Sequence, residues 1–132
     1  MAYIDANCMI YLIEQNPSWF PKVAVRIQGL RSMGYRLAVG ELVRAECFVG
    51  PFRSGDVVLE AQYRAIFTDP EFHMLTLTAA VFDLGARLRA KYSFKLPDAL
   101  HLATAIEHGC KLFLTADAKL SRCIELPVEL LS

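Results

Sequence analysis

The sequence has no net charge and lacks the short motifs of several common enzyme classes. Its 14 basic and 14 acidic side chains cancel over 132 residues, so no overall positive field attracts nucleic acid. It contains no G-x-x-x-x-G-K-[ST] loop and no G-x-S-x-G motif. These absences exclude P-loop nucleotide triphosphatases and serine hydrolases built on that elbow. Any anionic substrate must therefore be held by local contacts.

Paired cysteines and long apolar runs are also missing. Cys8, Cys47, Cys110 and Cys123 form no C-x-x-C pair, so we expect reduced thiols, with neither a structural zinc nor a disulfide framework. No apolar run reaches the roughly 18 residues that span a bilayer, and no basic segment precedes the apolar start of the chain. We therefore expect a cytoplasmic protein without membrane attachment.

Apolar residues are abundant for a chain of this size. They make up 55% of the sequence and charged residues 21%, which leaves more apolar surface than one core readily covers. We expect a single domain over residues 1–132 and a homo-oligomer or a permanent partner. The edge formed by Trp19 and Phe20 is a candidate for that contact, with ordinary core packing as the alternative.

Short apolar segments alternate with amphipathic ones along the chain. The expected strands are 3–4, 35–39, 72–77, 112–114 and 124–126, and the expected helices are 7–15, 19–33, 40–49, 54–67, 78–92, 96–108 and 117–122. This alternation predicts an α/β fold, with a parallel sheet of four to five strands flanked by helices on both faces.

Acidic residues follow two of these strands, at opposite ends of the chain. Asp5 comes directly after Met1–Ile4, and Asp117 comes shortly after Leu112–Leu114. In an open parallel sheet, ligands bind beyond the carboxyl ends of the strands where the strand order reverses, so these carboxylates can share a pocket. Capping of a helix or turn is the competing interpretation for both, and for Asp98 at the start of another helix.

Glu46 lies within the helix expected at 40–49. Spacings of three and four residues group it with Leu42 and Val43 on the face expected to pack inward, whereas Glu41 belongs to the outward face. A carboxylate on a buried face is costly unless it meets a cation or a metal ion. Glu46 is therefore a candidate for the same site.

Oxygen ligands of this kind suit Mg²⁺ or Mn²⁺, which retain several waters and often bind substrate phosphate as well. Such an ion activates a water and stabilises charge on a phosphodiester, so the four acids predict metal-assisted phosphodiester hydrolysis. A phosphoaspartyl phosphatase is a second hypothesis, because Asp5-Ala6-Asn7 follows a strand. The three histidines are expected to pack in the core or on the surface, with only His101 bordering the pocket. The candidates for phosphate contacts are Arg87, Arg89, Lys91 and Lys95, with a solvated helix face as the alternative.

Four segments resemble the PIN-domain ribonucleases and, within that group, the VapC-type toxins of toxin-antitoxin pairs. They are Tyr3–Asn7, Ala45–Gly50, Leu96–Ala105 and Leu114–Asp117. The resemblance covers nearly the whole chain, and the segment 96–105 is its most specific stretch. It implies a PIN-like domain and a Mg²⁺- or Mn²⁺-dependent endoribonuclease acting on RNA. It also implies a cognate antitoxin and a homodimer.

The resemblance also implies roles for individual residues. The implied metal-binding and catalytic acids are Asp5, Glu46, Asp98 and Asp117, with Asn7 and Thr115 orienting ligands or substrate. Relatives often carry Ser or Thr where this chain has Gly40 and Val43, so Glu41 is kept as an alternative to Glu46. A PIN-like module that binds RNA or protein without cleaving it is a further hypothesis.

Overall fold

Five short strands form one parallel sheet in the order β3-β2-β1-β4-β5. The computed structural model describes residues 1–132. The strands are β1 (Ala2–Ile4), β2 (Leu37–Gly40), β3 (Phe72–Leu75), β4 (Leu112–Thr115) and β5 (Val128–Leu130). The predicted α/β fold with a parallel sheet is confirmed.

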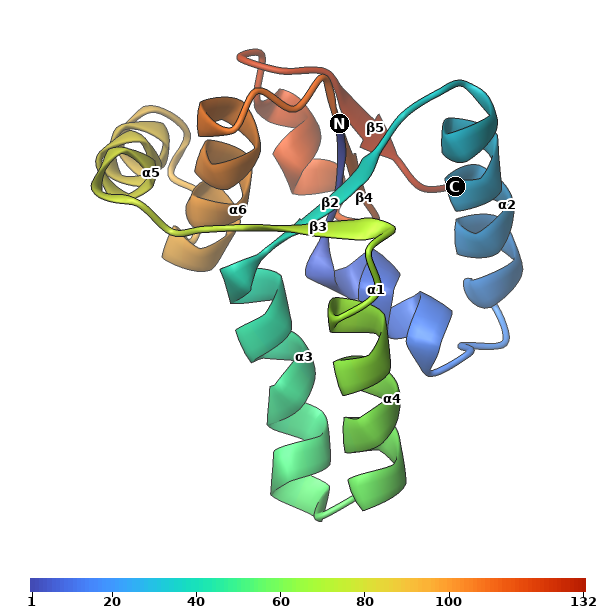
Figure 1. Cartoon of the computed structure of the whole chain (residues 1–132). Coiled ribbons are helices and arrows are strands. Elements are labelled where there is room, and N and C mark those ends of the chain that lie inside the picture. Colours follow the sequence, from blue (N-terminus) through green and yellow to red (C-terminus); the bar gives the residue numbers. More distant parts are fainter.

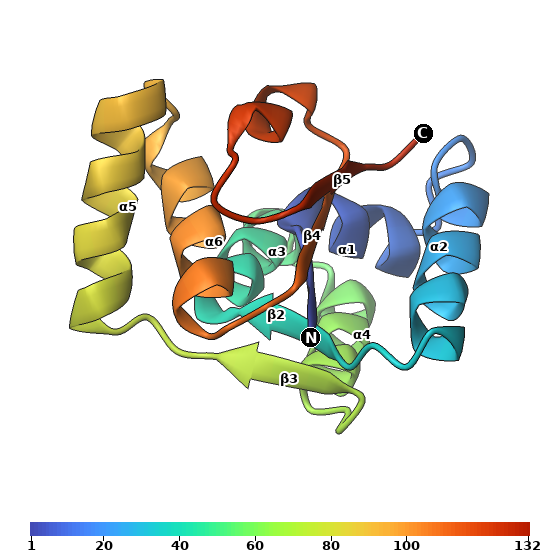
Figure 2. The same ribbon diagram turned by 90° about the horizontal axis from the view of Figure 1, so that it is seen from above.

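Six α-helices and one 3₁₀ helix connect the strands. They are α1 (Ala6–Ile13), α2 (Phe20–Ser32), α3 (Glu41–Ser54), α4 (Val57–Phe67), α5 (Ala79–Tyr92), α6 (Leu96–Glu107) and the 3₁₀ helix η1 (Ala118–Arg122). Helices α5 and α6 lie on one side of the sheet, and α1 and α2 lie on the other (Figure 2). Helices α3 and α4 form a hairpin that extends beyond the sheet (Figure 1). No helix is both long and apolar enough to cross a membrane.

The strand order reverses beside β1, and this places the candidate site. The chain builds β2 and β3 on one side of β1 and then returns to build β4 and β5 on the other. The carboxyl ends of β1 and β4 therefore meet at the reversal, where the backbone N–H of Asp5 donates to Leu114 O at 2.9 Å. Ligands of open α/β sheets bind at such a point.

The central strands are apolar because helices cover both of their faces. All three residues of β1 are fully buried, as are Phe113 and Leu114 of β4. Continuous apolar runs are typical of parallel strands covered on both faces. The rigid core therefore extends up to the residues that carry the acids.

Two predicted boundaries were wrong. Helix α3 does not stop at Gly50-Pro51 but continues to Ser54 with Pro51 buried inside it, and Gly55 ends the helix with a φ of 70°. The last strand is not 124–126 but β5, because the backbone N–H of Ile124 donates to the Tyr92 hydroxyl and ties that segment to α5.

Candidate active site

Asp5 is buried at the junction between β1 and α1. It caps α1 by accepting a hydrogen bond from the Ala6 N–H at 2.8 Å, through its Oδ1. Its other oxygen, Oδ2, accepts from the Thr115 hydroxyl at 2.7 Å. Only 4% of Asp5 is exposed, and this burial raises the pKa of its carboxyl, although His101 and the hydrogen bonds favour the charged form. Helix capping and a place in the site are therefore combined in one side chain.

Asn7 and Thr115 connect Asp5 to the end of β4. The Asn7 amide donates to Asp5 Oδ2 and to Thr115 Oγ1, each at 3.4 Å, and accepts from the Ala116 N–H at 3.2 Å. Thr115 Oγ1 also accepts from the Asp117 N–H at 3.1 Å. Both residues named from the sequence as orienting groups therefore contact Asp5 and fix it relative to the loop after β4.

Asp98 and Asp117 lie at the start of α6 and of η1. Asp117 caps η1 by accepting from the Lys119 N–H at 3.0 Å, whereas Asp98 lies in the first turn of α6. Burial raises the pKa of Asp98, and the negative charges of Asp5 and Asp117 raise it further. The structure thus brings these three acids into electrostatic contact.

Glu46 reaches the same region, but not in the way the sequence predicted. Its side chain is 41% exposed rather than buried on an inner face, because the neighbouring Cys47 and Val43 supply the buried face of α3. Its carboxylate turns back to accept a hydrogen bond from His101 Nε2. Glu41 is exposed at the first position of α3, and its charge is not among those that raise the pKa of Asp98, whereas that of Glu46 is. The geometry favours Glu46 over Glu41.

His101 is the residue that the sequence reasoning underestimated. It is 2% exposed, and its Nε2 lies 4.0 Å from Asp5 Oδ1 as well as contacting Glu46. Burial alone would lower the pKa of His101, but the hydrogen bond to Glu46 and the charge of Asp5 raise it. The signal was its position one turn after Asp98 on α6, which places both side chains on one helix face.

No lysine or arginine forms an ion pair with the acids of this site. The ion pairs formed by lysine and arginine all use other carboxylates, those of Glu60, Glu71, Glu125 and Glu129. As the side chains lie, no three His, Cys, Asp or Glu groups are close enough to bind one ion together. The donor chemistry nevertheless fits Mg²⁺ or Mn²⁺, because these ions retain several waters and take one or two carboxylates directly. A bound cation would offset the repulsion that Asp98 experiences from the charges of Asp5 and Asp117.

A small hollow of about 180 Å³ opens beside Asp98 and Asp117. Its lining combines these acids with three basic residues, Lys95, Lys119 and Arg122, and with Ser93 and Phe94. Most of the basic residues predicted to contact phosphate lie outside this hollow or are bound to other groups of the protein. Lys91 pairs with Glu125 at 2.6 Å, and Arg89 donates to the Phe94 carbonyl at 2.6 Å. Of those predicted residues only Lys95 lines the hollow.

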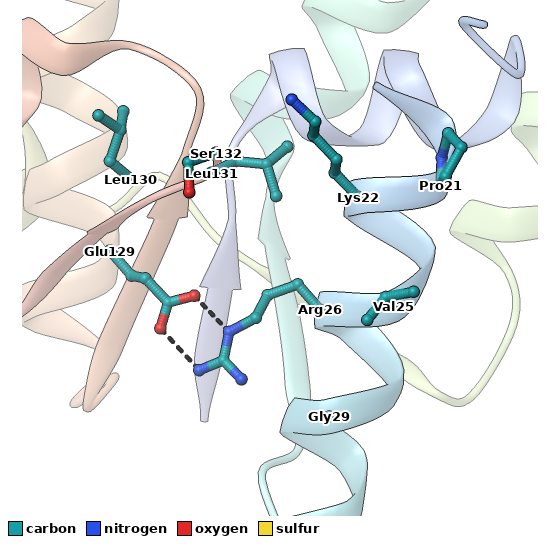
Figure 3. A pocket seen from close by; sticks show the side chains of 9 residues that line it. All are labelled: Pro21, Lys22, Val25, Arg26, Gly29, Glu129, Leu130, Leu131 and Ser132. Carbon is teal, nitrogen blue, oxygen red and sulfur yellow. Dashed lines mark hydrogen bonds and ion pairs between the residues drawn. The ribbon is translucent and has the colours of Figure 1, made fainter. Parts of the chain in front are cut away.

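The largest hollow, of about 580 Å³, lies between α2 and β5 and contains none of the predicted site residues. Figure 3 shows Arg26 reaching across it to bind both oxygens of Glu129. This pair links helix to strand and neutralises the guanidinium. This larger hollow is therefore not the site that the sequence predicts.

Comparisons with known proteins agree with this geometry. The PIN domain family matches residues 2–125. Among solved structures, VapBC2 of Rickettsia felis, bound to a DNA fragment from its promoter, has a TM-score of 0.80 at 20% identity and full coverage of both chains. A toxin-antitoxin complex from Klebsiella pneumoniae has a TM-score of 0.70 at 23% identity, covering 94% of this chain and 92% of that one.

A third structure is VapC20 of Mycobacterium tuberculosis, described as a toxin that cleaves the sarcin-ricin loop. Its TM-score is 0.73 at 14% identity, covering 96% of this chain and 99% of that one. At these identities the likeness is one of fold. No match was found among the curated proteins. Because the family match spans nearly the whole sequence, this chain belongs to the PIN domain family.

Proposed function

We propose that the protein is a Mg²⁺- or Mn²⁺-dependent endoribonuclease and the toxin of a toxin-antitoxin pair. One observation carries the proposal. Asp5 follows β1 at the reversal of strand order, Asp98 and Asp117 line one hollow, and no lysine or arginine forms an ion pair with any of the three. Clustered acids without a basic partner are the expected setting for a divalent cation.

In this proposal Asp5, Asp98 and Asp117 bind the metal, and Glu46 binds it through water or positions the attacking water. The bound ion would lower the pKa of a water and stabilise charge on the phosphate. Thr115 and Asn7 hold Asp5 in one rotamer through the hydrogen bonds described above. Burial of Asp5 excludes bulk water from that side of the site, which strengthens its interaction with any cation.

The basic lining of the small hollow supports a phosphodiester substrate. Lys95, Lys119 and Arg122 share that hollow with Asp98 and Asp117. Positive side chains beside a metal site can hold the flanking phosphates of an RNA chain, although the protein as a whole is neutral. The RNA would thus be held by local contacts, because the protein carries no net charge that could attract it.

The phosphatase alternative predicts a covalent phosphoenzyme at Asp5, whereas the metal-dependent nuclease forms none. Phosphoenzyme trapping at Asp5 therefore separates these two functions. A PIN-like module without catalysis predicts RNA binding with no cleavage. The cleavage assay below separates that alternative from the nuclease.

An exposed apolar surface supports the proposed antitoxin partner and homodimer. It lies on the α3–α4 hairpin and consists of Val49, Phe52, Val57 and Val58, which are 48% to 74% exposed. Trp19, proposed from the sequence as the contact edge, instead stacks on Tyr11 with 5.3 Å between ring centroids. The hairpin is therefore the better candidate for a protein contact. The four unpaired, buried cysteines support a reducing, cytoplasmic setting, which we also propose.

The test is an RNA cleavage assay with the purified protein in Mg²⁺ or Mn²⁺ and in chelator. We expect cleavage that needs the metal and falls about 100-fold or more in Asp98→Asn, the order seen when one preorganised electrostatic group is removed. Glu41→Gln serves as the matched control and should cleave like the wild type. Cleavage in chelator, or full activity of Asp98→Asn, would contradict the proposal.

A further inference from the structure

Both ring nitrogens of His101 are occupied within the protein. Nδ1 lies 2.8 Å from the Tyr3 hydroxyl, and Nε2 contacts the Glu46 carboxylate. An ionised carboxylate can only accept, so Nε2–H donates to Glu46. In the neutral ring Nδ1 then accepts from the Tyr3 O–H. The imidazole cannot rotate without breaking a hydrogen bond in the protein interior.

The position of Tyr3 is itself fixed from two sides. Its ring is fully buried and stacks on Phe113, with 5.0 Å between centroids and 6° between planes. Its hydroxyl fills the space beside Gly40, where a Cβ atom would lie 2.6 Å from the Tyr3 oxygen. Only glycine at the end of β2 leaves room for this hydroxyl. A rigid chain of contacts therefore leads from Gly40 to the histidine.

Glu46 is the flexible end of this series of contacts. Its side chain is 41% exposed on α3, so without a partner it would sample several rotamers in water. The contact with His101 selects the rotamer that directs the carboxylate toward Asp5, whose Oδ1 lies 4.0 Å from the same Nε2. A hydrogen bond from a buried, immobile ring thus orders an exposed acid.

We propose that His101 is a positioning residue, which holds the Glu46 carboxylate beside Asp5 and is itself held by the Tyr3 hydroxyl packed against Gly40. The inference rests on the proposed role of Glu46 at a metal site. Groups that orient metal-binding side chains typically affect metal affinity or activity about 10- to 100-fold. His101 contacts no substrate in this scheme and acts through Glu46 alone.

The experiment measures Mn²⁺ binding by calorimetry without RNA, together with kcat and KM for RNA cleavage. His101→Leu, which removes the donor to Glu46, should weaken Mn²⁺ binding about 10-fold and lower kcat with KM for RNA unchanged. Tyr3→Phe, which keeps the stacked ring, should give a smaller loss in the same direction. His108→Leu is the matched control, since His108 lies at the far end of α6 and its ring hydrogen-bonds to the Thr76 carbonyl and to none of the site residues. It should bind and cleave like the wild type.

A double variant separates positioning from general structural support. In a Glu46→Ala background, His101→Leu should cause no further loss, because the carboxylate that it positions is absent. Unchanged Mn²⁺ affinity in His101→Leu, or losses that multiply in the double variant, would overturn the proposal. If His101→Leu does not fold, Tyr3→Phe decides: weaker Mn²⁺ binding supports positioning, and unchanged binding refutes it. A wild type that neither binds Mn²⁺ nor cleaves RNA would instead refute the proposed function.

Discussion

Replacing Thr115 by valine tests how strongly the fold depends on holding Asp5 as a buried anion. Thr115 is fully buried, and its hydroxyl donates to Asp5 Oδ2 at 2.7 Å. Valine keeps the shape and removes that donor. A hydrogen bond to a charged group contributes about 1.5–3 kcal/mol, so we expect a loss of about 2 kcal/mol in the free energy of unfolding at pH 7. For a chain of this length that corresponds to a Tm lower by about 8 °C.

The loss should depend on pH because only the ionised carboxylate depends on the donor. The pKa of Asp5 is already raised by burial, and Thr115→Val should raise it further. As the pH falls through that raised pKa, Asp5 becomes neutral in the folded protein and the difference between variant and wild type should shrink. Urea unfolding at pH 7 and at pH 4 measures both values.

Thr104→Val is the matched control for this measurement. Thr104 is also fully buried, but its hydroxyl donates to the neutral Leu100 carbonyl of its own helix at 2.7 Å. Its loss should cost about 1 kcal/mol or less and should not change with pH. An equal cost for Thr115→Val at both pH values, or a cost no larger than that of Thr104→Val, would refute the reasoning.

Three further predictions concern charge and exposed surface. Asp98→Asn should raise Tm at pH 7 and give no gain at low pH. The pKa of Asp98 is raised in the folded protein, so wild-type stability falls as the pH rises through that pKa. An unchanged melting curve at pH 7 would contradict this. Lys119→Glu should weaken RNA binding and flatten its salt dependence, and a titration at several salt concentrations that shows neither would remove Lys119 from the interface. Phe52→Glu should leave the free energy of unfolding within about 1 kcal/mol of the wild-type value but weaken self-association or antitoxin binding in light scattering, whereas unaltered assembly would exclude the hairpin surface.

Much of the fold was predictable because its elements are marked locally. The strand that ends at Ile4 was predicted from an apolar run followed by Asp5, and Leu96-Pro97-Asp98 correctly predicted the start of α6. The signals failed where packing overrides local preference. Pro51 would normally end a helix, but it is buried and α3 continues past it to Ser54. Such an outcome depends on contacts between distant segments, which a local pattern does not contain.

The candidate site was predictable as a set of acids but not as a network. Asp5, Asp98 and Asp117 were visible at strand or helix ends and Glu46 by its helical spacing, and a parallel sheet allows Asp5 and Asp117 to share one edge. The link through His101 joins residues 98 positions apart in the case of Tyr3 and 55 in the case of Glu46. No periodicity reports contacts at that separation. The exposure of Glu46 was also not predicted, because helical spacing alone does not show how much of a side chain its neighbours cover.

The central claim is that acids without basic partners meet to bind a divalent cation, and anomalous diffraction tests it most directly. Crystals grown in Mn²⁺ and measured near the manganese absorption edge would locate the ion without reference to any substrate. The account predicts one or two anomalous peaks among the carboxylates of Asp5, Asp98 and Asp117, and none there in Asp98→Asn. A peak elsewhere on the protein, or an empty site in saturating Mn²⁺, would contradict it.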